Sequence, residues 1–333
     1  MKEAFFYEQL DDKRVRCRLC PHHCVIAEGK TGICRVRKNS DGRLYSLVYD
    51  RPIAQSVDPI EKKPLFHFYP GSRSFSIATV GCNMHCLHCQ NADISQSGPD
   101  GFPAREVTAE EIVKNAVNSG STSIAYTYTE PTIYFEYAFD IATLAHQKKL
   151  KNVFVTNGYI EKQAIEEFAP VLDAANIDLK GMTDEFYKTV CGAHLQPVLD
   201  AIRTYYDLGI WIEITTLVIP GYNDDSKTLT KIAQFIADID TSIPWHVTGF
   251  YPTYKLTDAT PTSVSMLENA VDIGKKAGLD YIYQGNRGSG EITFCPQCGK
   301  QLITRSGFMV SKNLAENGIC PKCHTPLAGV YLG

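Results

Sequence analysis

SFSIATVGCNMHCLHCQN, residues 74–91, joins a short apolar run to three closely spaced cysteines. An apolar run of this length that ends in glycine is typical of a buried strand. Cys82, Cys86 and Cys89 follow it in a C-x3-C-x2-C pattern, and three thiolates can hold three irons of a [4Fe–4S] cluster while the fourth iron stays open. The alternative is a zinc ion completed by a neighbouring histidine, but zinc ligands usually come as paired C-x2-C knuckles. The stretch therefore predicts an iron–sulfur cluster directly after a strand.

The chain beyond this motif alternates between strand-like and helix-like segments. Short apolar runs predict strands at 74–81, 122–128, 152–158, 176–181, 211–221, 244–254 and 281–286. Periodic apolar patterns predict helices at 108–120, 131–149, 161–175, 196–209, 226–239 and 265–278. Thr108 and Glu111 form a capping box at the start of the first of these helices.

This alternation predicts an α/β fold, because strands that alternate with helices pair in parallel through right-handed crossovers. Such units build either a doubly wound sheet or a partial (β/α)6 TIM-like barrel. Polar residues follow the first four strands, namely Cys82, Glu130, Asn157 and Lys180. Barrels carry their reactive groups at the carboxyl ends of the strands. We therefore favour the partial barrel, and place it at residues 75–290.

The cysteine content points to metal binding in a reducing compartment. Eleven of the 12 cysteines fall into three tight groups, and we expect the remaining one, Cys191, to be a small core residue. The start of the chain lacks a basic region followed by an apolar run, and no stretch approaches the ~20 apolar residues of a membrane span. We expect a cytoplasmic protein without membrane contact, in which clustered cysteines are metal ligands rather than disulfides. The net charge of −4 argues against a large nucleic-acid interface.

The two flanking cysteine groups predict two further metal sites. Residues 1–74 are expected to form a small metal module and a linker, with the ligands Cys17, Cys20, Cys24 and Cys34. Their spacing leaves both zinc and an auxiliary [4Fe–4S] cluster open; we favour zinc, and His22 or His23 could replace one thiolate. Residues 291–333 carry two C-x2-C knuckles, at Cys295, Cys298, Cys320 and Cys323. This pattern predicts a structural zinc-ribbon module, with a rubredoxin-like iron site as the rival.

The central motif resembles the signature of the radical SAM superfamily, and the resemblance covers residues 75–290. More narrowly, the chain resembles the pyruvate formate-lyase activating enzymes. With RCRLCPHHC at 16–24 and CQNADIS at 89–95, it is similar to the AmmeMemoRadiSam system radical SAM enzymes. The resemblance implies a radical SAM barrel that reductively cleaves S-adenosylmethionine at the cluster to a 5′-deoxyadenosyl radical, which abstracts hydrogen. It also implies an electron donor such as flavodoxin or ferredoxin, and Memo-like and AMMECR-like partner proteins.

The resemblance also implies a set of cofactor-binding residues, which are His88, Thr129, Glu130, Asn157, Asp178 and Lys180. His88 stands where the superfamily usually has an aromatic residue near the adenine. Thr129 and Glu130 fall where many members have Gly-Gly-Glu, which receives the methionine amino group. A carboxylate at Asp178 suits a ribose diol, and an ammonium at Lys180 suits the methionine carboxylate. The activases' Pro-Tyr-His after the sixth strand is Phe-Tyr-Pro here, at 250–252, so the activases' histidine has no counterpart at this point of the sequence.

Several of these residues also have structural readings. Glu130 precedes a proline and could simply begin a helix, the Asn157-Gly158 pair is a common turn signal, and Glu213 could be a buried ion-pair partner. Three functions therefore compete: a radical enzyme, a zinc-rich partner-binding scaffold and an RNA-modifying radical enzyme. The intact cysteine motif argues against the scaffold, and the net charge argues against RNA. No motif identifies the molecule that the radical attacks.

Overall fold

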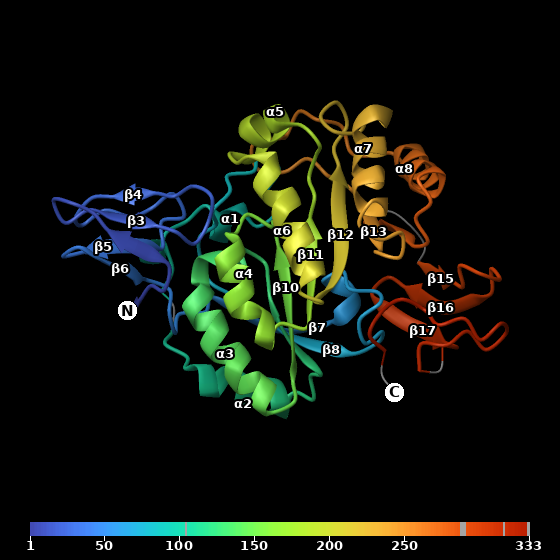
Figure 1. Ribbon diagram of the computed structural model, residues 1–333, viewed down its shortest axis with the longest axis horizontal. Helices are drawn as coiled ribbons and strands as arrows, with labels where there is room; N and C mark the ends of the chain where they lie inside the picture. The colour runs from blue at the N-terminus through green and yellow to red at the C-terminus, as the bar shows by residue number, and fades with distance from the viewer. Residues whose placement is uncertain (104, 287–290, 316, 332–333) are drawn as a thin grey trace.

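A curved, mostly parallel sheet forms the centre of the protein in the computed structural model, which describes residues 1–103, 105–286, 291–315 and 317–331 (Figure 1). The sheet has the strand order β14-β13-β12-β11-β10-β9-β8-β7. Its strands are β7 (Ala54–Pro59), β8 (Arg73–Ala78), β9 (Ser123–Tyr126), β10 (Lys151–Thr156), β11 (Ala174–Asp178), β12 (Trp211–Val218), β13 (Trp245–Gly249) and β14 (Ile282–Gly285). Strands β8 to β14 pair in parallel, and β7 pairs antiparallel to β8. Among the described residues the edge strands β7 and β14 do not pair, so the barrel is open.

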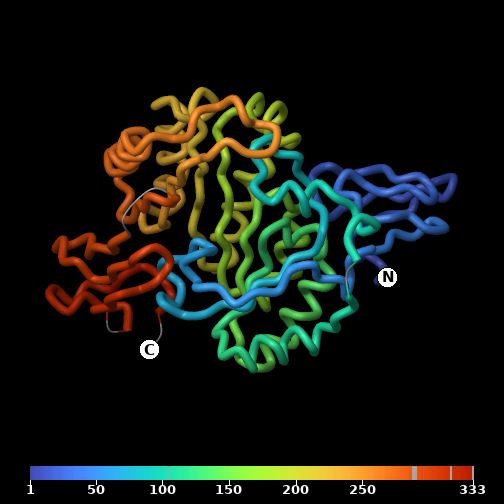
Figure 2. The backbone as a smooth tube through the Cα atoms, turned by 180° about the vertical axis from the view of Figure 1, so that it is seen from behind, coloured from blue at the N-terminus to red at the C-terminus, as the bar shows by residue number. Residues whose placement is uncertain are grey.

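Helices connect the parallel strands and cover one face of the sheet, while Figure 2 shows the strands from the other side. The longer helices are α2 (Ala109–Asn118), α3 (Phe135–Gln147), α4 (Lys162–Phe168), α6 (Leu195–Asp207), α7 (Ser226–Ala237) and α8 (Val264–Lys276), and the short ones are α1 (Ala92–Ser95) and α5 (Asp184–Phe186). The predicted α/β partial barrel is confirmed, and so is the capping box at Thr108 and Glu111. The helix predicted at 161–175 was too long: it ends at Phe168 because Pro170 cannot continue it, and β11 begins at Ala174.

The N-terminal module lies at one end of the barrel (Figure 1). It holds two small antiparallel sheets, built from β1 (Lys2–Glu3), β5 (Arg37–Ser40) and β6 (Arg43–Ser46), and from β2 (Tyr7–Gln9), β3 (Val15–Cys17) and β4 (Val25–Ile26). A buried ion pair fastens it to α3, since Arg37 Nη2 donates to both carboxylate oxygens of Glu136 at 2.7 and 2.6 Å. Strand β7 lies within the residues 1–74 expected outside the barrel, yet it pairs with β8 over six positions, so this part of the linker extends the main sheet.

The C-terminal module lies at the opposite end (Figure 2). It contains the antiparallel strands β15 (Ile292–Phe294), β16 (Gln301–Ser306) and β17 (Met309–Asn313). Its buried Arg305 donates from Nη2 to the carbonyl of Phe66 at 2.7 Å, and Val330 forms a parallel bridge with Phe68. Both contacts reach the segment 60–69, called the strap below, which connects β7 to β8.

Glu213, near the start of β12, holds the strap against the barrel. Its carboxylate accepts the backbone N–H groups of Phe66 and His67 at 2.9 and 2.7 Å, and a bond from His246 Nε2 at 2.6 Å. The residue is fully buried and lies 2.6 Å from His246, which agrees with the alternative reading of Glu213 as a buried structural partner. The strap is therefore a fixed wall of the barrel.

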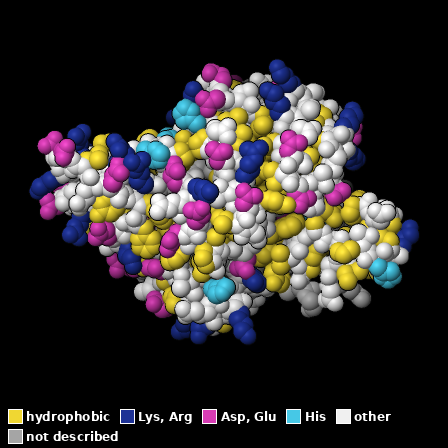
Figure 3. Space-filling model, viewed as in Figure 1, with side chains coloured by type: hydrophobic (Ala, Val, Ile, Leu, Met, Phe, Trp, Pro, Cys, Tyr) yellow, Lys and Arg dark blue, Asp and Glu magenta, His cyan; other side chains and the backbone are white. Residues whose placement is uncertain are grey.

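The surface carries interspersed charges. On the face drawn in Figure 3, basic and acidic side chains alternate over the N-terminal module and the barrel helices. Among the described residues, no helix combines the length and the apolar character needed to cross a bilayer.

Candidate functional site

The cysteine loop begins where β8 ends and is shaped by a glycine. Gly81 has a φ of +95°, a left-handed conformation that glycine adopts without strain. A Cβ at this position would lie 2.7 Å from Cγ1 of Val36 and 2.8 Å from the carbonyl oxygen of Cys34. The N-terminal module therefore packs directly on the residue that precedes Cys82.

The three cysteines of the loop line one cavity of about 590 Å³ at the carboxyl ends of the strands. Met84 N–H donates to the sulfur of Cys82 at 3.4 Å, and Cys89 Sγ lies 3.1 Å from Ser95 Oγ. Donors near the sulfurs suit thiolate ligands, because they offset part of the charge. The loop backbone is held in place by bonds to the turn at 187–191.

These sulfurs suit a cluster better than a single ion. Among the described residues, only the four cysteines of the C-terminal module bring three or more potential ligand atoms within 4.8 Å of one another. The three central sulfurs do not meet this criterion. A tetrahedral zinc ion needs such closeness, whereas each thiolate of a cluster binds a different iron. Burial raises the pKa of the Cys82 and Cys89 thiols, because it disfavours the charged thiolate. A bound metal cation offsets this penalty on the thiolate.

Cys191 lies beside this loop, as a neighbour of Cys86. A hydrogen bond with the Cys191 thiol lowers the pKa of Cys86. Cys191 is fully buried, and its backbone carbonyl accepts the N–H of His85 at 2.8 Å. It is a core residue as expected, and it also supports the cysteine loop.

Five of the six expected cofactor-binding residues line the same cavity: His88, Thr129, Asn157, Asp178 and Lys180. They come from the cysteine loop and from the ends of β9, β10 and β11. Asn157 Nδ2 lies 3.7 Å from the sulfur of Cys82 and donates to Asn83 Oδ1 at 2.9 Å. Thr129 donates its hydroxyl to the carbonyl of Thr79 at 2.8 Å.

Lys180 and His88 give the cavity a cation and an unpaired polar atom. Lys180 Nζ lies 2.5 Å from Asp178 Oδ2. Burial works against the charged form of Lys180, but the charges of Asp178 and Cys86 outweigh it and raise its pKa. Burial lowers the pKa of His88 to about 3, so its ring is neutral near pH 7. Its Nδ1 is buried and has no hydrogen-bond partner among the described residues, which marks a place for a ligand donor or acceptor.

Glu130 departs from the expectation, because it does not line the cavity. Its fully buried carboxylate accepts the hydroxyls of Thr132 and Thr156 at 2.6 and 2.7 Å and the N–H of Asn157 at 2.8 Å. All these donors belong to the protein, and burial raises the pKa of the carboxyl. The structure thus places Glu130 behind the cavity wall, where it positions Asn157.

The sequence reasoning missed Lys63, which the strap brings into the cavity wall. Its Nζ donates to Asp58 Oδ2 at 2.7 Å and to Ser76 Oγ at 2.5 Å. Burial lowers its pKa to about 8. Phe308 of the C-terminal module also lines the cavity. No local motif marks either residue, because both reach the site through long-range packing.

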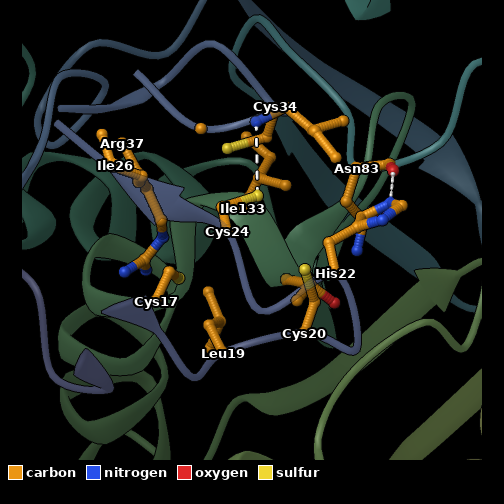
Figure 4. A pocket seen from close by; sticks show the side chains of 13 residues that line it. Cys17, Leu19, Cys20, His22, Cys24, Ile26, Cys34, Arg37, Asn83 and Ile133 are labelled. Carbon is orange, nitrogen blue, oxygen red and sulfur yellow. Dashed lines mark hydrogen bonds between the residues drawn. The ribbon is translucent and has the colours of Figure 1, made fainter. Parts of the chain in front are cut away.

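The two flanking cysteine groups have different geometries. In the C-terminal module, Cys295 and Cys323 have sulfurs 3.5 Å apart, and those of Cys298 and Cys320 are 3.7 Å apart. These separations fit a tetrahedral zinc ion. The N-terminal cysteines instead line a small hollow, drawn in Figure 4, and do not meet the same criterion of closeness.

Comparison with known proteins points to one superfamily. The pattern of the Radical SAM superfamily matches residues 76–232. The chain is 49% identical over 311 residues to "Uncharacterized protein MJ0808" of Methanocaldococcus jannaschii, covering 92% of each chain. It is 25% identical over 228 residues to the pyruvate formate-lyase 1-activating enzyme of Escherichia coli K12, covering 63% of this chain and 91% of the enzyme. A solved radical SAM methyltransferase from Sphaerobacter thermophilus shares the fold, with a TM-score of 0.52 and 17% identity over 70% of this chain and 71% of that one.

Proposed function

The chain belongs to the radical SAM superfamily, and from this premise we propose that it cleaves S-adenosylmethionine at a [4Fe–4S] cluster held by Cys82, Cys86 and Cys89. The observation that carries the proposal is that these three cysteines line one large cavity together with five of the six predicted cofactor residues. When bound, the cluster supplies one electron to the sulfonium, and the 5′-deoxyadenosyl radical released removes a hydrogen atom from the substrate.

The protein's own residues would bind and orient the cofactor. Lys180, kept charged by Asp178, suits the methionine carboxylate. The neutral ring of His88 offers Nδ1 and a flat face to the adenine. Asn157 donates toward Cys82 and is itself held by Glu130. Residues of the strap and Phe308 also line the cavity.

The similarity to the activating enzymes supports hydrogen abstraction from a substrate C–H bond as the reaction class. We further propose a one-electron donor such as flavodoxin or ferredoxin, Memo-like and AMMECR-like partners, and structural zinc in the C-terminal module. All 12 cysteines are free of disulfides, which supports our proposal of a reducing compartment such as the cytoplasm.

The test is formation of 5′-deoxyadenosine by anaerobically reconstituted protein given dithionite and S-adenosylmethionine. A variant with Cys82→Ala, Cys86→Ala and Cys89→Ala should form none. Its far-ultraviolet circular dichroism and its C-terminal zinc should remain, which would show that the barrel and the C-terminal module are folded. Absence of 5′-deoxyadenosine from wild-type protein with a full iron content would refute the proposal and leave the scaffold function.

A further inference from the structure

The four N-terminal cysteines surround one hollow, although they come from different segments. Cys17 ends β3, Cys20 and Cys24 lie in the connection to β4, and Cys34 precedes β5. Figure 4 shows their sulfurs spread around the hollow rather than gathered at one point. Apolar side chains, among them Leu19, complete the lining.

The spread of the sulfurs separates this site from a zinc site in the same protein. The C-terminal cysteines bring their four sulfurs within 4.8 Å of one another, and among the described residues no N-terminal set of ligand atoms does so. A single zinc ion with Zn–S bonds of ~2.3 Å needs sulfurs about 3.8 Å apart. A [4Fe–4S] cluster takes its thiolates farther apart, because each binds a different iron.

Both nearby histidines already have a partner at one ring nitrogen. His22 Nε2 lies 2.7 Å from the carbonyl oxygen of Asn83, and His23 Nε2 lies 2.8 Å from Glu161 Oε1. The four cysteines by themselves offer the hollow the four thiolates that a [4Fe–4S] cluster takes.

Arg37 shows that the hollow is built for an anionic group. Its side chain is 2% exposed, lines the hollow, and uses Nη2 for the ion pair with Glu136. Its Nε and Nη1 are buried without a hydrogen-bond partner among the described residues. A four-thiolate cluster carries net negative charge, and its sulfurs accept hydrogen bonds, so it would satisfy these donors. Ile33 N–H also donates to the sulfur of Cys24, at 3.5 Å.

The hollow lies next to the central cysteine loop. Asn83, the residue after Cys82, lines the hollow and accepts the bond from His22. On the other side of Cys82, Gly81 packs on the backbone of Cys34. Each of these contacts is one residue away from a ligand of the central cluster.

We propose that Cys17, Cys20, Cys24 and Cys34 hold a second [4Fe–4S] cluster that passes single electrons to the central one. The second cluster is oxidised from the 1+ to the 2+ state as the central cluster is reduced from 2+ to 1+, and a one-electron carrier protein reduces it again. The ligand assignment stands on the N-terminal geometry alone, and only the electron acceptor rests on the proposed function.

The test uses the full chain with Cys82→Ala, Cys86→Ala and Cys89→Ala, reconstituted anaerobically. We expect about four irons and four sulfides per chain in this variant, against about eight of each in the wild type. Adding Cys20→Ser and Cys24→Ser should bring the iron of the triple variant close to zero. A triple variant without iron but with two zinc ions per chain would overturn the proposal.

Electron paramagnetic resonance of the reduced wild type gives a second readout that does not depend on the variants' folding. We expect two cluster signals, of which only one shifts on addition of S-adenosylmethionine, and broadening of both by their proximity. A single signal that shifts completely would overturn the proposal. Iron retained in the triple variant, together with a wild type that forms no 5′-deoxyadenosine, would refute the proposed function and support this inference.

Discussion

Replacing Lys180 with methionine tests the cofactor pocket most directly. The substitution keeps the length and volume of the side chain but removes the ammonium that lies 2.5 Å from Asp178 in the cavity wall. A charge-assisted hydrogen bond contributes about 1.5–3 kcal/mol. Since 1.4 kcal/mol corresponds to a factor of ten, Lys180→Met should weaken S-adenosylmethionine binding about 10- to 150-fold. Isothermal titration calorimetry of the reconstituted protein, without reductant so that the cofactor is not consumed, measures this change.

The same substitution should leave the fold nearly intact. The side chain of Asp178 is 34% exposed, so water can solvate its carboxylate once Lys180 is gone, and we expect a loss of about 1 kcal/mol or less in unfolding free energy. Lys151→Met is the matched control, because Lys151 pairs with Asp173 at 2.7 Å outside the cavity. Equal cofactor affinity in Lys180→Met and the wild type, or an equal loss in both variants, would refute the assignment of Lys180.

Three further predictions concern the architecture around the site. Gly81→Ala should lower the melting temperature and the iron content more than the control Gly209→Ala. Both glycines have a positive φ, but only at Gly81 would the added methyl group collide with the N-terminal module, at 2.7 Å from Val36. Equal effects of the two substitutions in calorimetry and iron assays would contradict this. Burial raises the pKa of Glu213, but the hydrogen bond and charge of His246, the charge of His67 and the backbone N–H of Phe66 together outweigh burial and hold the pKa below the usual 4.5. The stability from this group is therefore complete above about pH 4.5 and is lost as the pH falls through the folded-state pKa; urea midpoints should fall with acid less steeply in Glu213→Gln, and parallel curves would refute this. Removing zinc, or introducing Cys298→Ser with Cys320→Ser, should let a protease cleave the C-terminal module while the barrel resists cleavage. The reason is that bound zinc contributes about 10–16 kcal/mol to the folding of such modules. If mass spectrometry shows that the module resists cleavage equally with and without these changes, metal does not hold it.

The site could be predicted from the sequence as far as its chemistry follows from local spacing. The pattern of Cys82, Cys86 and Cys89 after an apolar run predicted a cluster at a strand end, and the structure places all three on one cavity. Thr129, Asn157, Asp178 and Lys180 were expected from the resemblance to the radical SAM superfamily, and they line the same cavity because parallel strands bring their carboxyl ends to one edge of a sheet.

Side-chain direction was decided by tertiary packing. Glu130 stands at a strand end like its neighbours, yet its carboxylate turns away from the cavity to donors on the helix and on β10. Lys63 belongs to a segment without a motif, and only the strap's path across the barrel brings it to the site. Spacing places a group along the chain, whereas its direction depends on partners far away in the sequence.

The sequence by itself determined the α/β order of the fold, the three groups of cysteines and the chemistry of the central group. The alternation of strands with helices and the short spacings between ligands are local properties of the sequence, so they can be read before the fold is known. Only the tertiary structure decided how far apart the sulfurs lie, which distinguishes a compact C-terminal group from a spread N-terminal one of equal cysteine count. It also decided that the N-terminal module touches the residues on both sides of Cys82, through His22 and Cys34, because long-range packing alone sets those contacts.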